Sequence, residues 1–191
     1  MRAAEPAASF IPLRALSLAM TASKPTPKTT NVVYPTLNDL PANARSSLIG
    51  LLDGRLADAI DLQTQMKQAH WNVKGPTFIA LHELFDKVNE DVEEYVDDLA
   101  ERVVQLGGVA HGTVRQVSAR STLREYPAVS EGRQHVEAVS VALSTFGQGV
   151  RKAIDQSDRL GDKDTADLFT EISRGVDKWL WFVEAHLQTD R

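Results

Sequence analysis

Four long segments with apolar residues at helical spacing are the feature that most constrains this chain. Apolar residues recur every three or four positions over about 42–71, 76–106, 130–161 and 165–187, with no strand-like alternation. Each segment therefore has one apolar face that must be buried against the others. Amphipathic helices of this length predict an all-α four-helix bundle.

Glycine, proline and small polar residues set the predicted boundaries. Pro76 suits the first position of the second helix, and Gly107-Gly108 suits the end of it. Residues 109–129 make a connection that is long for a bundle, so we expect a crossover that carries a short helix over Val114–Ser118. Ser130 is the predicted N-cap of the third helix, and Asp164 or Thr165 that of the fourth.

The predicted core consists of one stripe on each helix. Its members are Leu48, Leu51, Leu52, Leu56, Ile60, Leu62 and Met66; Phe78, Leu81, Phe85, Val88, Val92, Tyr95, Leu99, Val103 and Leu106; Val136, Val139, Leu143, Phe146, Val150 and Ile154; and Leu168, Ile172, Val176, Trp179, Val183 and Leu187.

Charge separates a tail from the body of the chain. Residues 1–38 are rich in Ala, Ser, Thr and Pro and carry four basic residues against one acid, or 4 − 1 = +3. Since the whole chain carries −5, the remainder carries −5 − 3 = −8. We predict a flexible basic tail over 1–38 and a bundle domain over 39–191. The stretch Phe10–Met20 could be a weak targeting segment, but a disordered extension, or translation that starts at Met20 rather than Met1, is favoured.

Composition narrows the function. No apolar run is long enough to cross a membrane. The acidic body argues against a nucleic-acid-binding surface on the bundle. The chain has no cysteine, so a metal could be held only by His, Asp or Glu, which suit iron, manganese or zinc.

The second predicted helix carries two pairs of metal-ligand type. His82 and Asp86, and Asp97 and Glu101, are each four residues apart and so share a helix face. His70 lies just before the turn at Gly75-Pro76, which can fold it back beside His82. Any one such residue is more often a surface or packing residue. Asp97 and Glu101 together, however, form a like-charge pair that a cation would stabilise.

The two pairs are too far apart to hold one metal within a single chain. His82 and Asp97 are 15 residues apart, or roughly 22 Å along a helix axis, and they lie on nearly the same side of it. A second copy of the helix, antiparallel across a two-fold axis, would place one copy's Asp97 and Glu101 against the other's His82 and Asp86. The absence of any Glu-x-x-His sequence, the motif of a di-iron site inside one bundle, favours this arrangement.

Four motifs resemble the Dps mini-ferritins, the DNA-binding proteins from starved cells. They are His70-Trp-Asn-Val-Lys-Gly-Pro, His82-Glu-x-x-Asp86, Ala100-Glu-Arg-Val-Val-Gln-Leu-Gly-Gly108 and Asp177-Lys-x-Leu-Trp-Phe-x-Glu-Ala-His186. The resemblance covers about residues 40–188. It implies a ferritin-like fold and a hollow shell of twelve subunits.

The resemblance also implies a ferroxidase. His70, His82 and Asp86 of one subunit, with Asp97 and Glu101 of its two-fold mate, would bind two iron ions, or one iron and a weakly held second metal. Hydrogen peroxide would be the oxidant, and ferric iron would be stored in the shell. Trp71 resembles a residue that intercepts oxidising equivalents, although a helix-end core aromatic is an equal alternative.

Further implied roles fall on the acidic turn and the tail. Asp158, Asp162, Asp164 and Asp167 cluster where the family has an iron pore, with Lys163 interrupting them. Weak DNA binding would come from the tail, through Lys24 and Lys28. The implied location is the cytoplasm, with association to the nucleoid if DNA is bound.

Two other functions remain open at this stage. The chain could be a structural protein that compacts DNA, with iron chemistry secondary, or a bundle that binds zinc or another ion without redox chemistry. His111, His135 and His186 have no partner at metal-ligand spacing and are interpreted as structural or surface residues. Trp179 and Trp181 are interpreted as core or interface residues.

Overall fold

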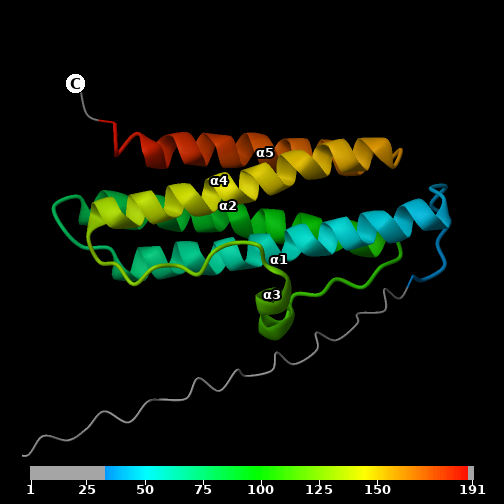
Figure 1. Cartoon of the computed structure of the whole chain (residues 1–191), viewed down its shortest axis with the longest axis horizontal. Coiled ribbons are helices and arrows are strands. Elements are labelled where there is room, and N and C mark those ends of the chain that lie inside the picture. The colour runs from blue at the N-terminus through cyan, green and yellow to red at the C-terminus, as the bar shows by residue number, and fades with distance from the viewer. Residues whose placement is uncertain (1–32, 189–191) are drawn as a thin grey trace, which may run out of the picture.

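The computed structural model describes residues 33–188 and shows an all-α fold in which four long helices form the bundle. The helices are α1 (Ala42–Asn72), α2 (Phe78–Gln105), α3 (Val114–Arg120), α4 (Gly132–Arg159) and α5 (Lys163–Glu184). Figure 1 shows α1 beside α2 and α4 beside α5, with α3 projecting beside α1. The predicted bundle and the short helix in the crossover are confirmed, and α3 extends two residues beyond the expected Ser118.

The crossover makes α2 and α4 run in the same direction (Figure 1). Three carboxylates of α1 hold it in place. Asp53 Oδ2 lies 2.8 Å from His111 Nδ1, and fully buried Asp58 accepts a hydrogen bond from the backbone N–H of Thr122. Asp61 accepts a hydrogen bond from Ser121 Oγ. The polar residues of α1 that interrupt its apolar stripe therefore anchor the connection.

The predicted apolar stripes form most of the core, which runs the length of the bundle. Phe85, Phe146 and Phe169 are among the largest fully buried side chains. Phe78 is an exception, because it is 42% exposed at the first position of α2. Trp179 is buried in the core, whereas Trp181 is 62% exposed.

Three predicted helix starts are wrong by one to three residues. The N-cap of α2 is Thr77, so Pro76 lies in the turn before the helix. The N-cap of α4 is Glu131, because the carbonyl of Ser130 instead accepts the N–H of Lys74. Asp162 caps α5 by accepting the N–H of Thr165.

The segment before α1 lies against the end of α2. The N–H of Tyr34 donates to the carbonyl of Gly107 over 2.7 Å. Gly107 has φ +88°, a conformation that favours glycine, as predicted for the end of this helix. Residues 1–32, which include Lys24 and Lys28, lie outside the described part of the chain.

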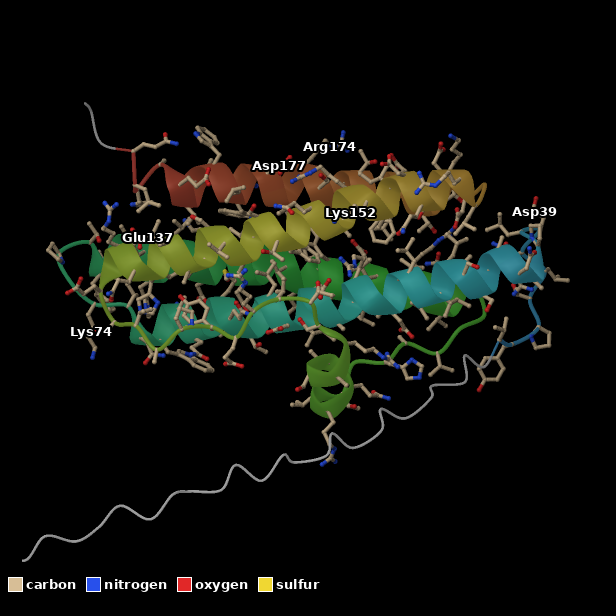
Figure 2. All side chains as sticks on the ribbon, viewed as in Figure 1. Asp39, Lys74, Glu137, Lys152, Arg174 and Asp177 are labelled. Atoms are coloured by element: carbon tan, nitrogen blue, oxygen red, sulfur yellow. The ribbon has the colours of Figure 1, made fainter. Side chains whose placement is uncertain are left out.

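Charged side chains cover the outside of the bundle. Figure 2 shows Lys152, Arg174 and Asp177 extending from the α4–α5 side, away from the core. Asp177 accepts a hydrogen bond from Arg151 across the two helices. Among the described helices, none is long and apolar enough to cross a membrane.

Candidate metal centre

His70 and His82 form a reciprocal pair where α1 ends and α2 begins. Their rings stack with centroids 3.7 Å apart. The Nδ1 of His70 lies 2.8 Å from the carbonyl oxygen of His82, and the Nδ1 of His82 lies 2.9 Å from that of His70. His70 is in the last turn of α1, where carbonyls lack a partner within the helix. The bond from Nδ1 of His82 therefore also satisfies the carbonyl of His70. The turn thus folds the two histidines together as the sequence predicted.

These bonds determine which ring nitrogens can bind a metal. A carbonyl oxygen only accepts, so each Nδ1 donates its proton in this bond, and Nε2 is the ring nitrogen left for a metal. An imidazole fixed through Nδ1–H to a backbone carbonyl is a common arrangement of metal-binding histidines. Both histidines are thus held in the form that can coordinate a cation.

Asp86 lies one turn beyond His82 and is already engaged by a cation of the chain. Lys67 Nζ lies 2.6 Å from Asp86 Oδ1, and His70 Nδ1 lies 3.8 Å from the same oxygen. The hydrogen bond from Lys67 lowers the pKa of Asp86 below its usual value; partial burial opposes this, and the charges of His70, Lys67 and His82 add to it. The carboxyl group is therefore ionised and accessible.

Lys67 is a functional candidate that the sequence reasoning missed. It lies one helical turn before His70 on α1, a spacing that places both on one face. The spacing is visible in the sequence, but lysine is not a metal-ligand type, so a search for ligand patterns does not single it out. Its ammonium group lies 2.6 Å from Asp86 Oδ1 and neutralises that carboxylate within the chain.

Asp97 and Glu101 lie on the same helix at a distance from the histidines. Both are exposed, and neither forms a hydrogen bond or an ion pair with another described residue. Because α2 is continuous from Phe78 to Gln105, the separation of Asp97 from His82 remains roughly 22 Å. Within residues 33–188, no group of three or more His, Asp or Glu side chains gathers at one metal position.

Trp71 follows His70 and is 70% exposed, so it is not a core aromatic of the single chain. It lies at the α1 end that carries the histidine pair.

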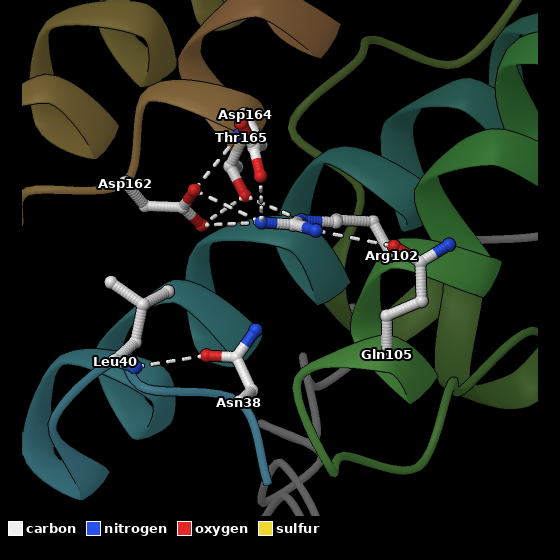
Figure 3. A network of polar contacts seen from close by, with 7 residues as sticks. All are labelled: Asn38, Leu40, Arg102, Gln105, Asp162, Asp164 and Thr165. Atoms are coloured by element: carbon white, nitrogen blue, oxygen red, sulfur yellow. Dashed lines mark hydrogen bonds and ion pairs between the residues drawn. The ribbon is translucent and has the colours of Figure 1, made fainter.

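Of the four predicted pore carboxylates in the turn between α4 and α5, Asp162 is buried and the other three are exposed. Asp162 is only 3% exposed and accepts hydrogen bonds from Arg102 Nη2 at 2.9 and 3.0 Å, as Figure 3 shows. Asp158 pairs with Lys163, and the side chain of Asp164 is 87% exposed, 3.9 Å from Arg102. Asp167 is exposed. Asp162 is thus engaged as the cap of α5, and the other carboxylates face solvent.

Comparison with known proteins agrees with the fold and the motifs. Residues 49–191 match the ferritin-like domain family. The chain is 49% identical over 156 residues to the DNA protection during starvation protein of Agrobacterium fabrum, covering 81% of this chain and 96% of that protein. It is 33% identical to the Mycolicibacterium smegmatis protein of the same name over 161 residues, which cover 84% of this chain and 86% of the relative.

A solved structure supports the same assignment. DpsA14 from Streptomyces coelicolor superposes with a TM-score of 0.79 at 34% identity, covering 83% of this chain and 95% of that one. Fold, sequence and family match therefore agree, and the chain belongs to the Dps family of ferritin-like proteins.

Proposed function

We propose that this protein oxidises ferrous iron with hydrogen peroxide and stores the ferric product in a hollow shell of twelve subunits, limiting oxidative damage to DNA. The observation that carries the proposal is the reciprocal His70–His82 pair, which uses both Nδ1 atoms and leaves Nε2 of each ring for a metal, with Asp86 3.8 Å from the ring of His70. Two imidazoles and a carboxylate suit ferrous iron, which is the substrate. Carboxylate oxygens also favour the ferric product.

The other half of each site comes from a second subunit. Asp97 and Glu101 are exposed and without partners in the described chain, roughly 22 Å from the histidines on one continuous helix. Antiparallel pairing of two α2 helices across a two-fold axis would complete two identical sites. The six carboxylates and four histidines of these two sites would then bind iron only in the assembled protein.

Lys67 determines how many cations each site holds. Its ammonium lies 2.6 Å from Asp86, where a second cation would need the same oxygen. Since like charges repel at this distance, the first ferrous ion binds next to the histidines and a second binds weakly. The Lys67–Asp86 pair also keeps the carboxylate from being left without a counterion when no iron is present.

Iron would reach the interior through the turn between α4 and α5. Asp164 and Asp167 are exposed there, and Asp158 is paired only with a solvent-exposed lysine. Symmetry copies of such carboxylates would attract a divalent cation. Asp162 would hold the turn in shape through Arg102 rather than face the passage.

Iron oxidation in solution tests this proposal. Anaerobic protein given ferrous iron and then hydrogen peroxide should develop ferric absorbance faster than buffer alone. His82→Ala should lose most of that rate, whereas Glu83→Ala, its exposed neighbour, should keep it. Equal rates for wild type, His82→Ala and protein-free buffer would reject the proposal.

DNA binding is the second candidate function, because relatives are named for DNA protection. Residues 1–32 carry a basic excess of 4 − 1 = +3 per chain, so twelve tails would have to act together. A chain without residues 1–32 should lose any gel shift, and the full chain's shift should weaken as salt rises. Unchanged binding by the shortened chain would place the DNA site elsewhere.

A further inference from the structure

A second polar pair, Tyr126 and His135, is buried on the core side of the helices that carry the proposed ligands. The hydroxyl oxygen of Tyr126 lies 2.8 Å from Nδ1 of His135, and the two rings are 5.9 Å apart. Both residues are buried, at 6% and 0% exposed. A buried phenol and imidazole at this distance share one proton.

The surroundings indicate where that proton lies. Burial raises the pKa of Tyr126, so the phenol stays protonated. Burial lowers the pKa of His135, although the backbone carbonyls of Asn72 and Val129 oppose this, so the imidazole is neutral. Nε2 of His135 makes no well-aligned hydrogen bond to a described group, so Nδ1 is the nitrogen that pairs with the protonated phenol. Nδ1 therefore accepts the O–H of Tyr126.

This pair packs behind the two helices that carry the histidine half of the metal centre. The ring of Phe85, the residue before Asp86, lies 6.4 Å from the ring of His135. Tyr126 and His135 also line a pocket of about 420 Å³ together with Gln68 and Asn72. Gln68 and Asn72 lie two residues to either side of His70 on α1, a spacing that places this pocket and His70 on opposite faces of the same end of the helix.

We propose that Tyr126, with His135 as its proton acceptor, supplies the second electron when hydrogen peroxide oxidises a single ferrous ion at this centre. The proposal rests on the proposed ferroxidase function. Peroxide needs two electrons to form two waters, and one ferrous ion gives only one. Because Lys67 disfavours a second cation, a site with one iron needs another donor if it is not to release a hydroxyl radical.

The step is balanced. Fe²⁺ becomes Fe³⁺ and releases one electron. The O–H bond of Tyr126 breaks, its electron goes to the peroxide, and its proton passes to Nδ1 of His135. With two protons from solvent, the O–O bond of H₂O₂ breaks and two H₂O form. The products are Fe³⁺, a neutral phenoxyl radical at Tyr126, protonated His135 and two waters, and the total charge is +4 on both sides.

His135 makes Tyr126 better suited to this role than the exposed aromatics. Oxidising a phenol makes it strongly acidic, so a base already bonded to the hydroxyl removes the cost of a separate proton loss. Trp71 and Tyr34 are instead 70% and 57% exposed. Burial also keeps a phenoxyl radical at Tyr126 away from solvent and DNA until a later electron reduces it.

Freeze-quench electron paramagnetic resonance tests the proposal on assembled protein in a Tyr34→Phe background. One ferrous ion per site and one equivalent of hydrogen peroxide are mixed, and ferric absorbance is followed in parallel. We expect a phenoxyl signal that Tyr126→Phe abolishes and that Tyr95→Phe and Trp71→Phe leave in place. His135→Gln, which keeps polarity but removes the imidazole base, should shorten the lifetime of the signal.

A metal-free arm separates this proposal from the ferroxidase proposal. The same variants, without iron, are oxidised by a photogenerated one-electron oxidant such as a ruthenium(III) polypyridyl complex. Here too the phenoxyl signal should disappear in Tyr126→Phe and persist in Tyr95→Phe. If wild type oxidises no iron, the ferroxidase proposal fails and this arm alone decides the role of Tyr126. A phenoxyl signal that survives Tyr126→Phe, or none in the Tyr34→Phe parent, overturns the assignment.

Discussion

Lys67 Nζ lies 2.6 Å from Asp86 Oδ1, so the candidate metal centre already contains one positive charge of the protein itself. The pair joins α1 to α2 beside the two histidines. Under the proposed function, this contact limits the number of cations that the centre can hold.

Replacing Lys67 should therefore strengthen binding of a second metal. In Lys67→Gln, the charge that competes for Asp86 is gone, and we expect the second cation to bind about tenfold more tightly, or ~1.4 kcal/mol. Calorimetry with Zn²⁺ or Co²⁺, which peroxide does not oxidise readily, measures the stoichiometry on assembled protein. Lys87→Gln removes an exposed lysine next to Asp86 in sequence and is the matched control. The same weak second binding in Lys67→Gln and wild type would contradict this role.

The sequence predicted the histidine pair but not its neighbour. Spacing alone placed His70 and His82 at the two ends of one turn, and the ring stacking confirms that they meet. Lys67 was missed because it contributes by charge and not as a ligand. The Tyr126–His135 contact was missed because His135 has no partner at helical spacing, and Tyr126 reaches it from an irregular connection.

Helix faces were predicted more accurately than helix starts. A buried face repeats over many turns, so errors at single positions such as Phe78 do not alter the fold. A helix cap depends on the hydrogen bonds of a single residue. Ser130 is not the N-cap of α4, because its carbonyl accepts the N–H of Lys74. Asp162 is the N-cap of α5, because its carboxylate also binds Arg102. Neither partner is near in sequence.

Asp162 should contribute to stability in a pH-dependent way. Its burial raises its pKa, but hydrogen bonds from Thr165 and Arg102 and the charge of Arg102 outweigh this, so its pKa is below 3.8. The unfolded chain binds this proton more readily, so the stabilisation is present above about pH 4 and is lost as pH falls through the folded-state pKa.

Asp162→Asn should thus lower the free energy of unfolding at pH 7 by about 1–3 kcal/mol, because the charged bonds to Arg102 are weakened. Urea unfolding at pH 7 and at pH 3 measures the effect, which should shrink at the lower pH. Asp164→Asn is the control, since Asp164 is exposed and only 3.9 Å from the same arginine. If Asp162→Asn and Asp164→Asn lowered the free energy of unfolding equally, the bonds between Asp162 and Arg102 would have no special role in stability.

Gly107 should be intolerant of a side chain. Its φ is +88°, and a Cβ there would lie 2.7 Å from the carbonyl oxygen of Tyr34. We expect Gly107→Ala to destabilise by about 1–3 kcal/mol. Gly54→Ala is the matched control, because Gly54 is within α1 and its Cβ would have no atom within 4 Å. That change should stabilise the helix by about 0.5–1 kcal/mol. Thermal unfolding of both variants measures the contrast, and equal melting temperatures would disprove the close contact at Tyr34.

Complementation between two inactive chains tests the shared site. His82→Ala removes one half of each site and Asp97→Ala the other, so shells made of either chain alone should be inactive. Where the two chains pair across a two-fold axis, one site loses both residues and the other keeps both. With random pairing, half of the pairs are mixed and one site in two of those is intact, so a 1:1 mixture should regain about a quarter of the wild-type rate.

The control for this test is a shell in which chains carrying both substitutions are mixed with chains carrying His82→Ala. No pairing in that mixture gives an intact site, because every chain lacks His82, so its rate should stay at the level of either parent. Mass spectrometry of the intact shells verifies the mixing, and ferric absorbance gives the rate. If each site lay within one chain, every site in the 1:1 mixture would still lack a residue. Verified mixed shells that remain inactive would therefore reject the intersubunit centre while leaving the His70–His82 geometry unaffected.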